Sequence, residues 1–224
     1  MNIFQLKYRA CFHIRLFMLF MVLVAFNTNP VQAQSQGVLL VMGDSLSAAY
    51  GMPTEQGWVA LLQQKLTQTN KDKPFNIQVV NASLSGETTS GGLQRLPGLV
   101  QRHQPNYVVI ELGANDALRG QDLRATERNL ARMIEISQQA GAKVLLLGIR
   151  LPTNYGPAYD ERLAQTYLNL AETYQLDLDA FFLEDVALDP GLMQDDGLHP
   201  NQAAQPLILQ RLWPRLQNLM ALQN

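Results

Sequence analysis

The stretch Val38-Leu-Leu-Val-Met-Gly-Asp-Ser-Leu-Ser47 joins an apolar run to a turn that carries reactive side chains. Residues 38–42 are uniformly apolar, which is typical of a β-strand buried on both faces of a parallel sheet. The Gly-Asp-Ser turn follows where this strand ends. Because functional groups in parallel α/β sheets gather at the carboxyl ends of the strands, the stretch predicts both the first strand and the position of a site.

Short apolar runs alternate with longer amphipathic stretches through the rest of the chain. The expected strands cover residues 38–42, 76–80, 107–111, 143–147 and 176–182. The expected helices cover residues 58–66, 88–102, 126–140, 159–174 and 200–222, and Pro206 and Pro214 predict a late start or a kink in the last one. Strands joined by helical crossovers predict an α/β fold of three layers, in which helices cover both faces of a parallel sheet.

The first 33 residues differ in composition from the rest. Three basic residues precede an apolar run over residues 16–26, and Val31-Gln-Ala33 is typical of a cleavage site with small residues. The apolar run is short against the roughly 20 residues that a membrane-spanning helix needs, so an uncleaved anchor is the weaker interpretation. We interpret residues 1–33 as a signal peptide and residues 34–224 as a single domain. We expect a periplasmic or secreted protein without a stable membrane span after cleavage.

Charge and cysteine content exclude several function classes. The chain has 17 basic and 19 acidic residues, and three basic residues but no acid lie in residues 1–33, so the remainder has a net charge of −5. An acidic body argues against a nucleic-acid partner, because such proteins neutralise phosphates with Lys and Arg. The single cysteine, Cys11, lies in the expected signal peptide, which excludes disulfides and thiol catalysis. The two histidines after residue 33, His103 and His199, have no cluster of further zinc ligands around them, so the sequence does not support zinc catalysis and we expect no metal.

Four segments at the predicted carboxyl edge carry complementary groups. They are Gly43–Ser47, Asn81–Gly86, Gly113–Asp116 and Asp195–Pro200. A serine hydroxyl attacks an ester or thioester only when a base takes its proton, and an imidazole suits that role near neutral pH. Ser45 is the candidate nucleophile. His199 is the better candidate base, because His103 lies in a polar connection ahead of the third strand.

The other groups complete the requirements of acyl transfer. Asp196 precedes His199 by three residues and can accept the Nδ1 proton in a tight turn, although the adjacent Asp195 is an alternative. The amides of Ser45 and Gly86 and the side chain of Asn115 are candidate donors to an oxyanion. Each segment alone also occurs as an ordinary turn or helix cap, so the combination is what favours catalysis.

These residues resemble the four sequence blocks of the SGNH hydrolases, also called the GDSL family. The resemblance covers essentially the whole mature chain. Further matches resemble the subgroup of periplasmic acyl-CoA thioesterases, lysophospholipases and arylesterases; they are residues 43–48, 81–83, 149–156 and 193–201. The family implies a flavodoxin-like sheet of order 2-1-3-4-5, with Ser45, His199 and Asp196 as a catalytic triad. Ser45, Gly86 and Asn115 would then form the oxyanion hole.

The resemblance also implies where substrate binds and what it is. The segment from Leu151 to Tyr155 and the one after Asn115 would flank an acyl-chain groove. The candidate substrate-binding residues are Asp44, Leu84, Ala117, Leu151, Pro152 and Tyr155. The implied activity is hydrolysis of small acyl esters and thioesters through an acyl-enzyme, without a cofactor, and a monomer is the default expectation.

Two alternatives stay open. An esterase that removes acetyl groups from extracytoplasmic glycans would use the same four blocks, and a lipid-binding module without catalysis could be built on the same scaffold. Other serine enzymes fit less well. Ser45 lacks the final glycine of the α/β-hydrolase nucleophile elbow, and no lysine follows it at the third position. The sequence leaves the acyl-chain length and the physiological substrate open.

Overall fold

A five-stranded parallel sheet with the strand order β2-β1-β3-β4-β5 forms the centre of the fold. The computed structural model of the chain describes residues 35–69 and 75–222. The strands are β1 (Ser35–Gly43), β2 (Phe75–Asn81), β3 (Tyr107–Glu111), β4 (Lys143–Leu147) and β5 (Asp177–Asp179). The α/β class and the sheet order that the family resemblance implied are therefore confirmed.

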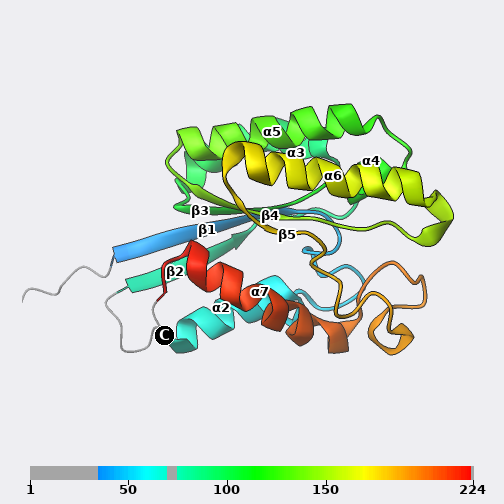
Figure 1. Ribbon diagram of the computed structural model, residues 1–224. Coiled ribbons are helices and arrows are strands. Elements are labelled where there is room, and N and C mark those ends of the chain that lie inside the picture. The colour runs from blue at the N-terminus through cyan, green and yellow to red at the C-terminus, as the bar shows by residue number, and fades with distance from the viewer. Residues whose placement is uncertain (1–34, 70–74, 223–224) are drawn as a thin grey trace, which may run out of the picture. The chain divides into compact units, whose positions relative to one another are not determined.

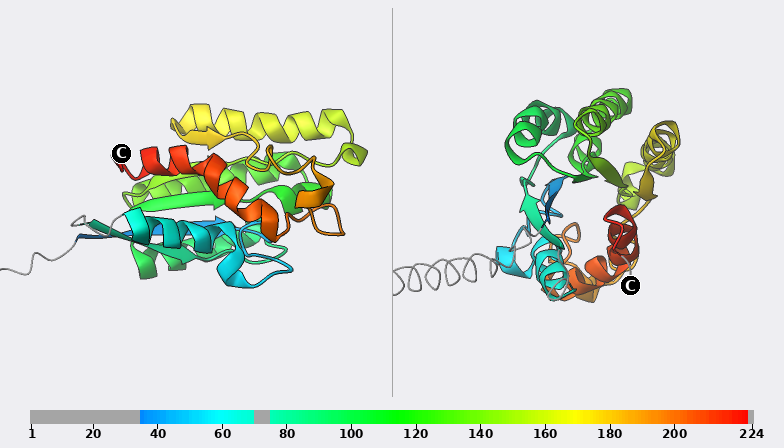
Figure 2. Two further views of the ribbon diagram at one scale, coloured as in Figure 1. Left: turned by 90° about the horizontal axis from the view of Figure 1, so that it is seen from below. Right: turned by 90° about the vertical axis from the view of Figure 1, so that its left-hand side faces the viewer.

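Helices cover both faces of this sheet, as Figures 1 and 2 show. The helices are α2 (Trp58–Thr69), α3 (Thr89–His103), α4 (Ala114–Leu118), α5 (Leu123–Gln139), α6 (Pro157–Tyr174) and α7 (Gln205–Leu219). Helices α3, α5 and α6 lie on one face, and α2 and α7 pack together on the other. The predicted three layers are confirmed.

The core lies on both sides of the central strands. Leu39, Leu40, Val41 and Met42 of β1 have no exposed surface, as the uniformly apolar run predicted. Burial of each such side chain stabilises the fold by about 1.5–3 kcal/mol. The strand that carries the Gly-Asp-Ser turn is therefore a rigid support for it.

Several elements differ in their bounds from the expectations; the first strand, for example, begins at Ser35 instead of residue 38. The fifth strand ends at Asp179 instead of residue 182, because the chain turns there and Phe182 is buried from within the turn. Helix α5 begins at Leu123, three residues earlier than expected, since Asp122 caps it by accepting from the Arg124 amide. Residues 114–118, expected as part of a loop, form the short helix α4.

The last helix has the late start that its prolines predicted. A 3₁₀ turn over residues 202–204 precedes α7, and Pro206 occupies its first turn, where a missing amide proton costs nothing. The expected signal peptide, residues 1–33, lies outside the described residues. Within residues 35–69 and 75–222, no helix has the length and apolar character that crossing a bilayer requires.

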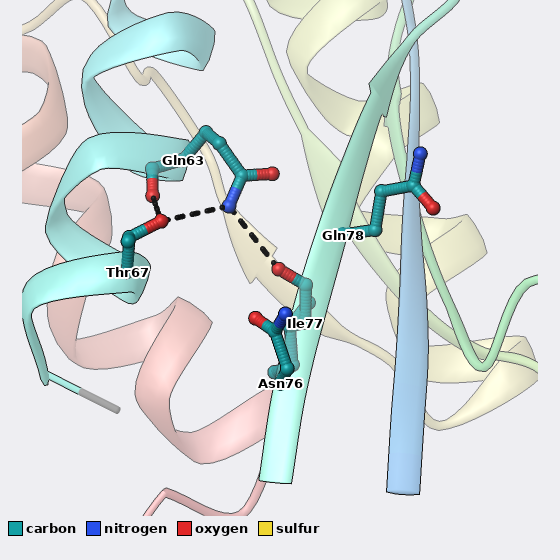
Figure 3. A pocket seen from close by; sticks show the side chains of 5 residues that line it. All are labelled: Gln63, Thr67, Asn76, Ile77 and Gln78. Atoms are coloured by element: carbon teal, nitrogen blue, oxygen red, sulfur yellow. Dashed lines mark hydrogen bonds between the residues drawn. The ribbon is translucent and has the colours of Figure 1, made fainter. Parts of the chain in front are cut away.

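The outer edge of β2 is closed by a side chain of α2, shown in Figure 3. The Gln63 amide donates to the Ile77 carbonyl at 3.2 Å and accepts from the Val79 amide at 2.7 Å. It thus replaces a neighbouring strand at the exposed edge, where free amides and carbonyls favour association. A cavity of about 210 Å³ lies here, and its lining contains none of the candidate catalytic residues.

Candidate active site

Ser45 lies in the turn directly after β1, and the turn is held by Asp44. The Asp44 carboxylate accepts from the Leu46 amide at 3.0 Å, and its carbonyl accepts from the Ala48 amide at 2.9 Å. Ser45 is partly buried, with its Oγ 2.9 Å from Nε2 of His199. The structure therefore brings together a hydroxyl and an imidazole that lie 154 residues apart in the sequence.

His199 is held from the other side by Asp196. Oδ2 of Asp196 lies 2.6 Å from Nδ1 of the imidazole. The other oxygen of Asp196 accepts from the backbone amides of Leu198 and His199, at 2.9 and 3.0 Å. Gly197 has a φ of +65°, a conformation that glycine adopts readily, and this allows the tight turn. Asp196, and not the exposed Asp195, is thus the carboxylate in contact with the imidazole.

The surroundings of Asp196 keep its carboxyl group ionised. Burial acts to raise its pKa, but hydrogen bonds from the amides of His199 and Leu198 and the contact with the imidazole outweigh this. The net effect lowers the pKa of Asp196 from 3.8 to about 2. At neutral pH the imidazole therefore faces a carboxylate, which favours the tautomer with a proton on Nδ1 and a free Nε2.

The sequence analysis missed two residues that hold the His199 turn. The Gln194 side chain donates to the carbonyls of Tyr50 and Pro200 at 2.8 and 3.1 Å, and its backbone amide donates to the His199 carbonyl at 2.7 Å. The Tyr50 ring packs against the imidazole with a centroid distance of 4.5 Å. Nothing in the local sequence indicates the contact between Gln194 and Tyr50, because the two residues lie 144 positions apart.

The segments that carry Gly86 and Asn115 both attach to the Ser45 turn. The Leu84 amide donates to the carbonyl of Gly43 at 3.1 Å, which places the Gly86 loop beside the end of β1. Asn115 lies in the first turn of α4, and its Nδ2 donates to Oδ2 of Asp44 at 3.0 Å. With the contact between Ser45 and His199, all four sequence blocks are thus linked by hydrogen bonds to the segment after β1.

Glu111 is a further buried acid beneath this site that the sequence analysis missed. Its carboxyl accepts from the Asp44 amide at 3.2 Å and from the Ser47 hydroxyl at 2.8 Å. A Cβ on Gly43 would lie 2.7 Å from the carboxyl oxygen of Glu111, so glycine is required there for the close approach. Burial and the charge of Asp44 raise the pKa of Glu111 well above its usual value. Burial also raises the pKa of Asp44, from 3.8 to about 6.

The Asp44→Asn variant is expected to gain stability relative to the wild type as pH rises from about 4 to 7. A carboxyl whose pKa is raised on folding stabilises the fold below its unfolded pKa, and that stability is lost as pH rises through about 6. An asparagine has no such loss, so the difference in unfolding free energy should grow by about 2 kcal/mol between these pH values. Urea unfolding at pH 4 and pH 7 measures it, with the exposed Asp195→Asn as the matched control. A difference that is the same at both pH values would contradict the expectation.

The candidate substrate-binding residues fall into two groups. Leu84 and Tyr155 are exposed to 50% and 36%, and Pro152 is also exposed. The others are buried; they are Asp44, Ala117 and Leu151. The Tyr155 hydroxyl donates to the Leu118 carbonyl at 3.2 Å, so the two segments expected to flank an acyl-chain groove are in contact.

His103 lies at the opposite edge of the sheet from Ser45, Asp196 and His199. It is the last residue of α3, which begins after the carboxyl end of β2 and returns to the opposite edge of the sheet. Across residues 35–69 and 75–222, no three or more His, Cys, Asp or Glu side chains are grouped so that they could hold a metal ion. At the carboxyl edge the structure places a hydroxyl, an imidazole and a carboxylate in a row.

The fold and a family match together define the class of this protein as an ester hydrolase. The model of the GDSL-like Lipase/Acylhydrolase family matches residues 41–206, which include all four sequence blocks. The chain belongs to this family. The membership that the sequence blocks indicated is therefore confirmed, and with it the expectation that the chain is an enzyme.

Individual relatives are similar over nearly their whole length. The chain is 51% identical over 189 residues to Esterase TesA of Pseudomonas aeruginosa, covering 84% of this chain and 92% of that protein. It is 42% identical over 216 residues to Thioesterase 1/protease 1/lysophospholipase L1 of Escherichia coli K12, covering 96% and 98%. The crystal structure of TesA superposes with a TM-score of 0.77 at 50% identity, covering 81% of this chain and 99% of that one.

Proposed function

We propose that this protein hydrolyses acyl esters and thioesters through a covalent acyl-enzyme on Ser45. His199 takes the proton from the Ser45 hydroxyl as its Oγ attacks the carbonyl carbon. The resulting oxyanion accepts hydrogen bonds from the amides of Ser45 and Gly86 and from the Asn115 side chain. His199 then protonates the departing alcohol or thiol, and a water molecule repeats the sequence to release the acid and regenerate Ser45.

The spacing of three side chains is the main support for this proposal. The Ser45 hydroxyl, the His199 imidazole and the Asp196 carboxylate form a continuous row with spacings of 2.9 and 2.6 Å. These spacings lie within the range at which a base can take a proton from a nucleophile. The row ends at the partly buried Ser45, at the edge of the sheet where the exposed Leu84 and Tyr155 also lie.

The substrate class follows from the relatives and from the surface. The names esterase and thioesterase/lysophospholipase belong to relatives that share at least 42% of their residues with this chain. Exposed apolar side chains, Leu84 and Tyr155, favour an apolar acyl group over an acetyl group. We infer that long-chain or aryl acyl esters are preferred, with lysophospholipids among the substrates.

Export bears on which of these substrates the protein meets. We propose that residues 1–33 are removed as a signal peptide and that the mature enzyme is periplasmic or secreted. A coenzyme A thioester is a cytoplasmic metabolite, so lipid esters would be the relevant targets outside the cytoplasm. Expression of the full-length chain, followed by N-terminal sequencing of the exported protein, should give a sequence that begins at Gln34.

An activity panel on the purified exported protein tests the proposed substrates. It comprises acyl thioesters, lysophospholipids and aryl esters of graded chain length, with acetylated glycans as the competing class. We expect kcat/KM to be higher for the longer acyl chains than for acetyl esters of the same leaving group. The reverse order, together with activity on acetylated glycans, would support the glycan acetylesterase instead.

A further inference from the structure

Helix α3 begins between the two segments that carry the proposed oxyanion donors. Gly86 precedes its cap, Thr88, by two residues, and the Thr88 side chain accepts from the Gly91 amide at 3.2 Å. Asn115 lies on a different segment, after β3. The Arg119 guanidinium, at the end of α4, donates to the Gly86 carbonyl at 3.1 Å, but it is exposed, so the spacing of the two donors also depends on what each segment is attached to.

Arg95 attaches the Gly86 loop to α3 at two points. One guanidinium nitrogen donates to the Glu87 carboxylate at 2.6 Å, and another donates to the Ala82 carbonyl at 2.8 Å. The two acceptors lie on either side of Gly86 in the sequence. The side chains of Arg95 and Glu87 are only 30% and 10% exposed, so this ion pair is screened less than one at the surface.

The glycine at position 91 explains how Glu87 fits over the first turn of α3. A Cβ at this position would collide with the Glu87 carboxylate. Two glycines, Gly91 and Gly92, lie in the first turn of this helix, and glycine weakens a helix on propensity alone. At Gly91 the missing side chain leaves room for the Glu87 carboxylate, which Arg95 binds.

Asp116 attaches the Asn115 segment to the same turn of α3. Its carboxylate is 1% exposed and accepts from the Thr89 amide at 2.8 Å and from the Thr89 hydroxyl at 2.5 Å. Asn129 of α5 donates to the Thr89 hydroxyl at 3.0 Å, so Thr89 itself is fixed. Asp116 adjoins Asn115, and its position limits where the Asn115 backbone can lie.

We propose that the first two turns of α3 are a strut that sets the spacing between the Gly86 amide and the Asn115 side chain, with Arg95 and Thr89 as its positioning residues. Arg95 fixes the loop on one side of the oxyanion, and Thr89, through Asp116, fixes the segment on the other. Arg95 acts through Glu87 and Ala82, and Thr89 acts through Asp116. The inference rests on the proposed function, since it assigns a purpose to two of the proposed oxyanion donors.

The strut affects the rate because oxyanion donors act over a narrow range of distance. A donor stabilises the tetrahedral state when it lies about 2.7–3.1 Å from the oxyanion, and a displacement of about 1 Å can lower the rate about 100-fold. The ground-state ester carbonyl is bound less strongly by the same donors. Loss of the strut should therefore lower kcat and leave KM nearly unchanged.

The variants Arg95→Gln, Arg95→Lys and Thr89→Val test the strut, with Arg132→Gln as the matched control. Arg132 pairs with Glu135 on the surface of α5, so its loss removes an ion pair away from the site. We expect kcat for a soluble aryl ester to fall about 10- to 100-fold in Arg95→Gln and Thr89→Val, with KM within about twofold of the wild type. Arg95→Lys should recover part of the rate, because an ammonium group can still pair with Glu87.

An alkylboronic acid provides a readout that general destabilisation would not move. Its tetrahedral adduct with a serine places an oxygen in the oxyanion hole, so its inhibition constant should rise by the same factor by which kcat falls. Fluorophosphonate titration gives the concentration of reactive sites, and each rate is divided by it. If Arg95→Gln yields too little folded protein, Arg95→Lys and Thr89→Val decide the question.

The outcomes separate this inference from the function on which it rests. The variant Asn115→Ala is expected to lower kcat by about 10²–10³. A wild-type kcat in Arg95→Gln and Thr89→Val, beside that fall in Asn115→Ala, would overturn the strut alone. A wild-type kcat in Asn115→Ala would overturn the oxyanion hole itself. A boronate inhibition constant that stays constant while kcat falls would also overturn the strut.

Discussion

Replacement of Ser45 by alanine is expected to lower the turnover of ester substrates by about 10⁶-fold. The methyl group has no oxygen to attack the carbonyl, so the acyl-enzyme cannot form and only binding and oxyanion stabilisation remain. His199→Ala should have a similar effect, because the hydroxyl and the imidazole, 2.9 Å apart, act as one unit. The double variant should accordingly be no slower than either single one. Initial rates on the preferred substrate of the panel measure all three.

Covalent labelling tests the role of Ser45 as the nucleophile without the need for a known substrate. A fluorophosphonate should label the wild type at one site and fail to label Ser45→Ala. The control Thr69→Ala, which removes an exposed hydroxyl at the end of α2, should be labelled and should hydrolyse esters as the wild type does. A near-normal rate in Ser45→Ala would defeat the assignment of the nucleophile. A wild-type protein that binds lipid but neither reacts with the probe nor hydrolyses esters would support the lipid-binding module.

The fold could be predicted because most of its strands are short apolar runs that differ in composition from the amphipathic segments around them. Residues 107–111 and 143–147 are short apolar runs that occur in the structure with those bounds. The fifth strand is different, since it lies at an edge and two of its three residues are aspartates. A strand was expected over residues 176–182, but its Asp177 and Asp179 bind Arg215 and Arg211 of α7, and no local pattern indicates those ion pairs.

The reactive row could be predicted for a related reason. Ser45, Asp196 and His199 carry functional groups whose chemistry is specific, and parallel topology brings the ends of strands together whatever the intervening sequence. The supporting residues lack that property. Glu111 looks like an ordinary residue at the end of a strand, and only the folded structure shows that it lies beneath Asp44.

Supporting contacts of this kind join distant segments through common residue types. Gln194 binds Tyr50, Arg95 binds Ala82 across two elements, and Thr89 binds Asp116. A glutamine, an arginine or a threonine at such a position is compatible with simple exposure to solvent. The positions of Gly91 and Gly43 were a signal that could have been used, because each glycine leaves space for a carboxyl group that approaches closely.

The two neighbouring aspartates provide the second large expected effect. Asp196→Asn should lower kcat/KM by about 10⁴-fold, because an amide can hold the imidazole in the wrong tautomer and does not stabilise the imidazolium that forms. Because its pKa is lowered to about 2, Asp196 stays ionised throughout the neutral pH range. The fall in kcat/KM should therefore be nearly constant across that range. Steady-state rates between pH 6 and pH 9 measure this effect.

Asp195→Asn is the matched comparison, since it makes the same chemical change one residue away. Asp195 is exposed, whereas Oδ2 of Asp196 lies 2.6 Å from the imidazole, so Asp195→Asn should retain a rate within a few-fold of the wild type. The two variants would lose activity equally if either carboxylate could serve, and the order would be reversed if Asp195 were the partner in solution. A large fall in Asp196→Asn alone requires that the turn keeps its shape during turnover. The two amides that bind the other oxygen of Asp196 are the physical reason to expect that it does.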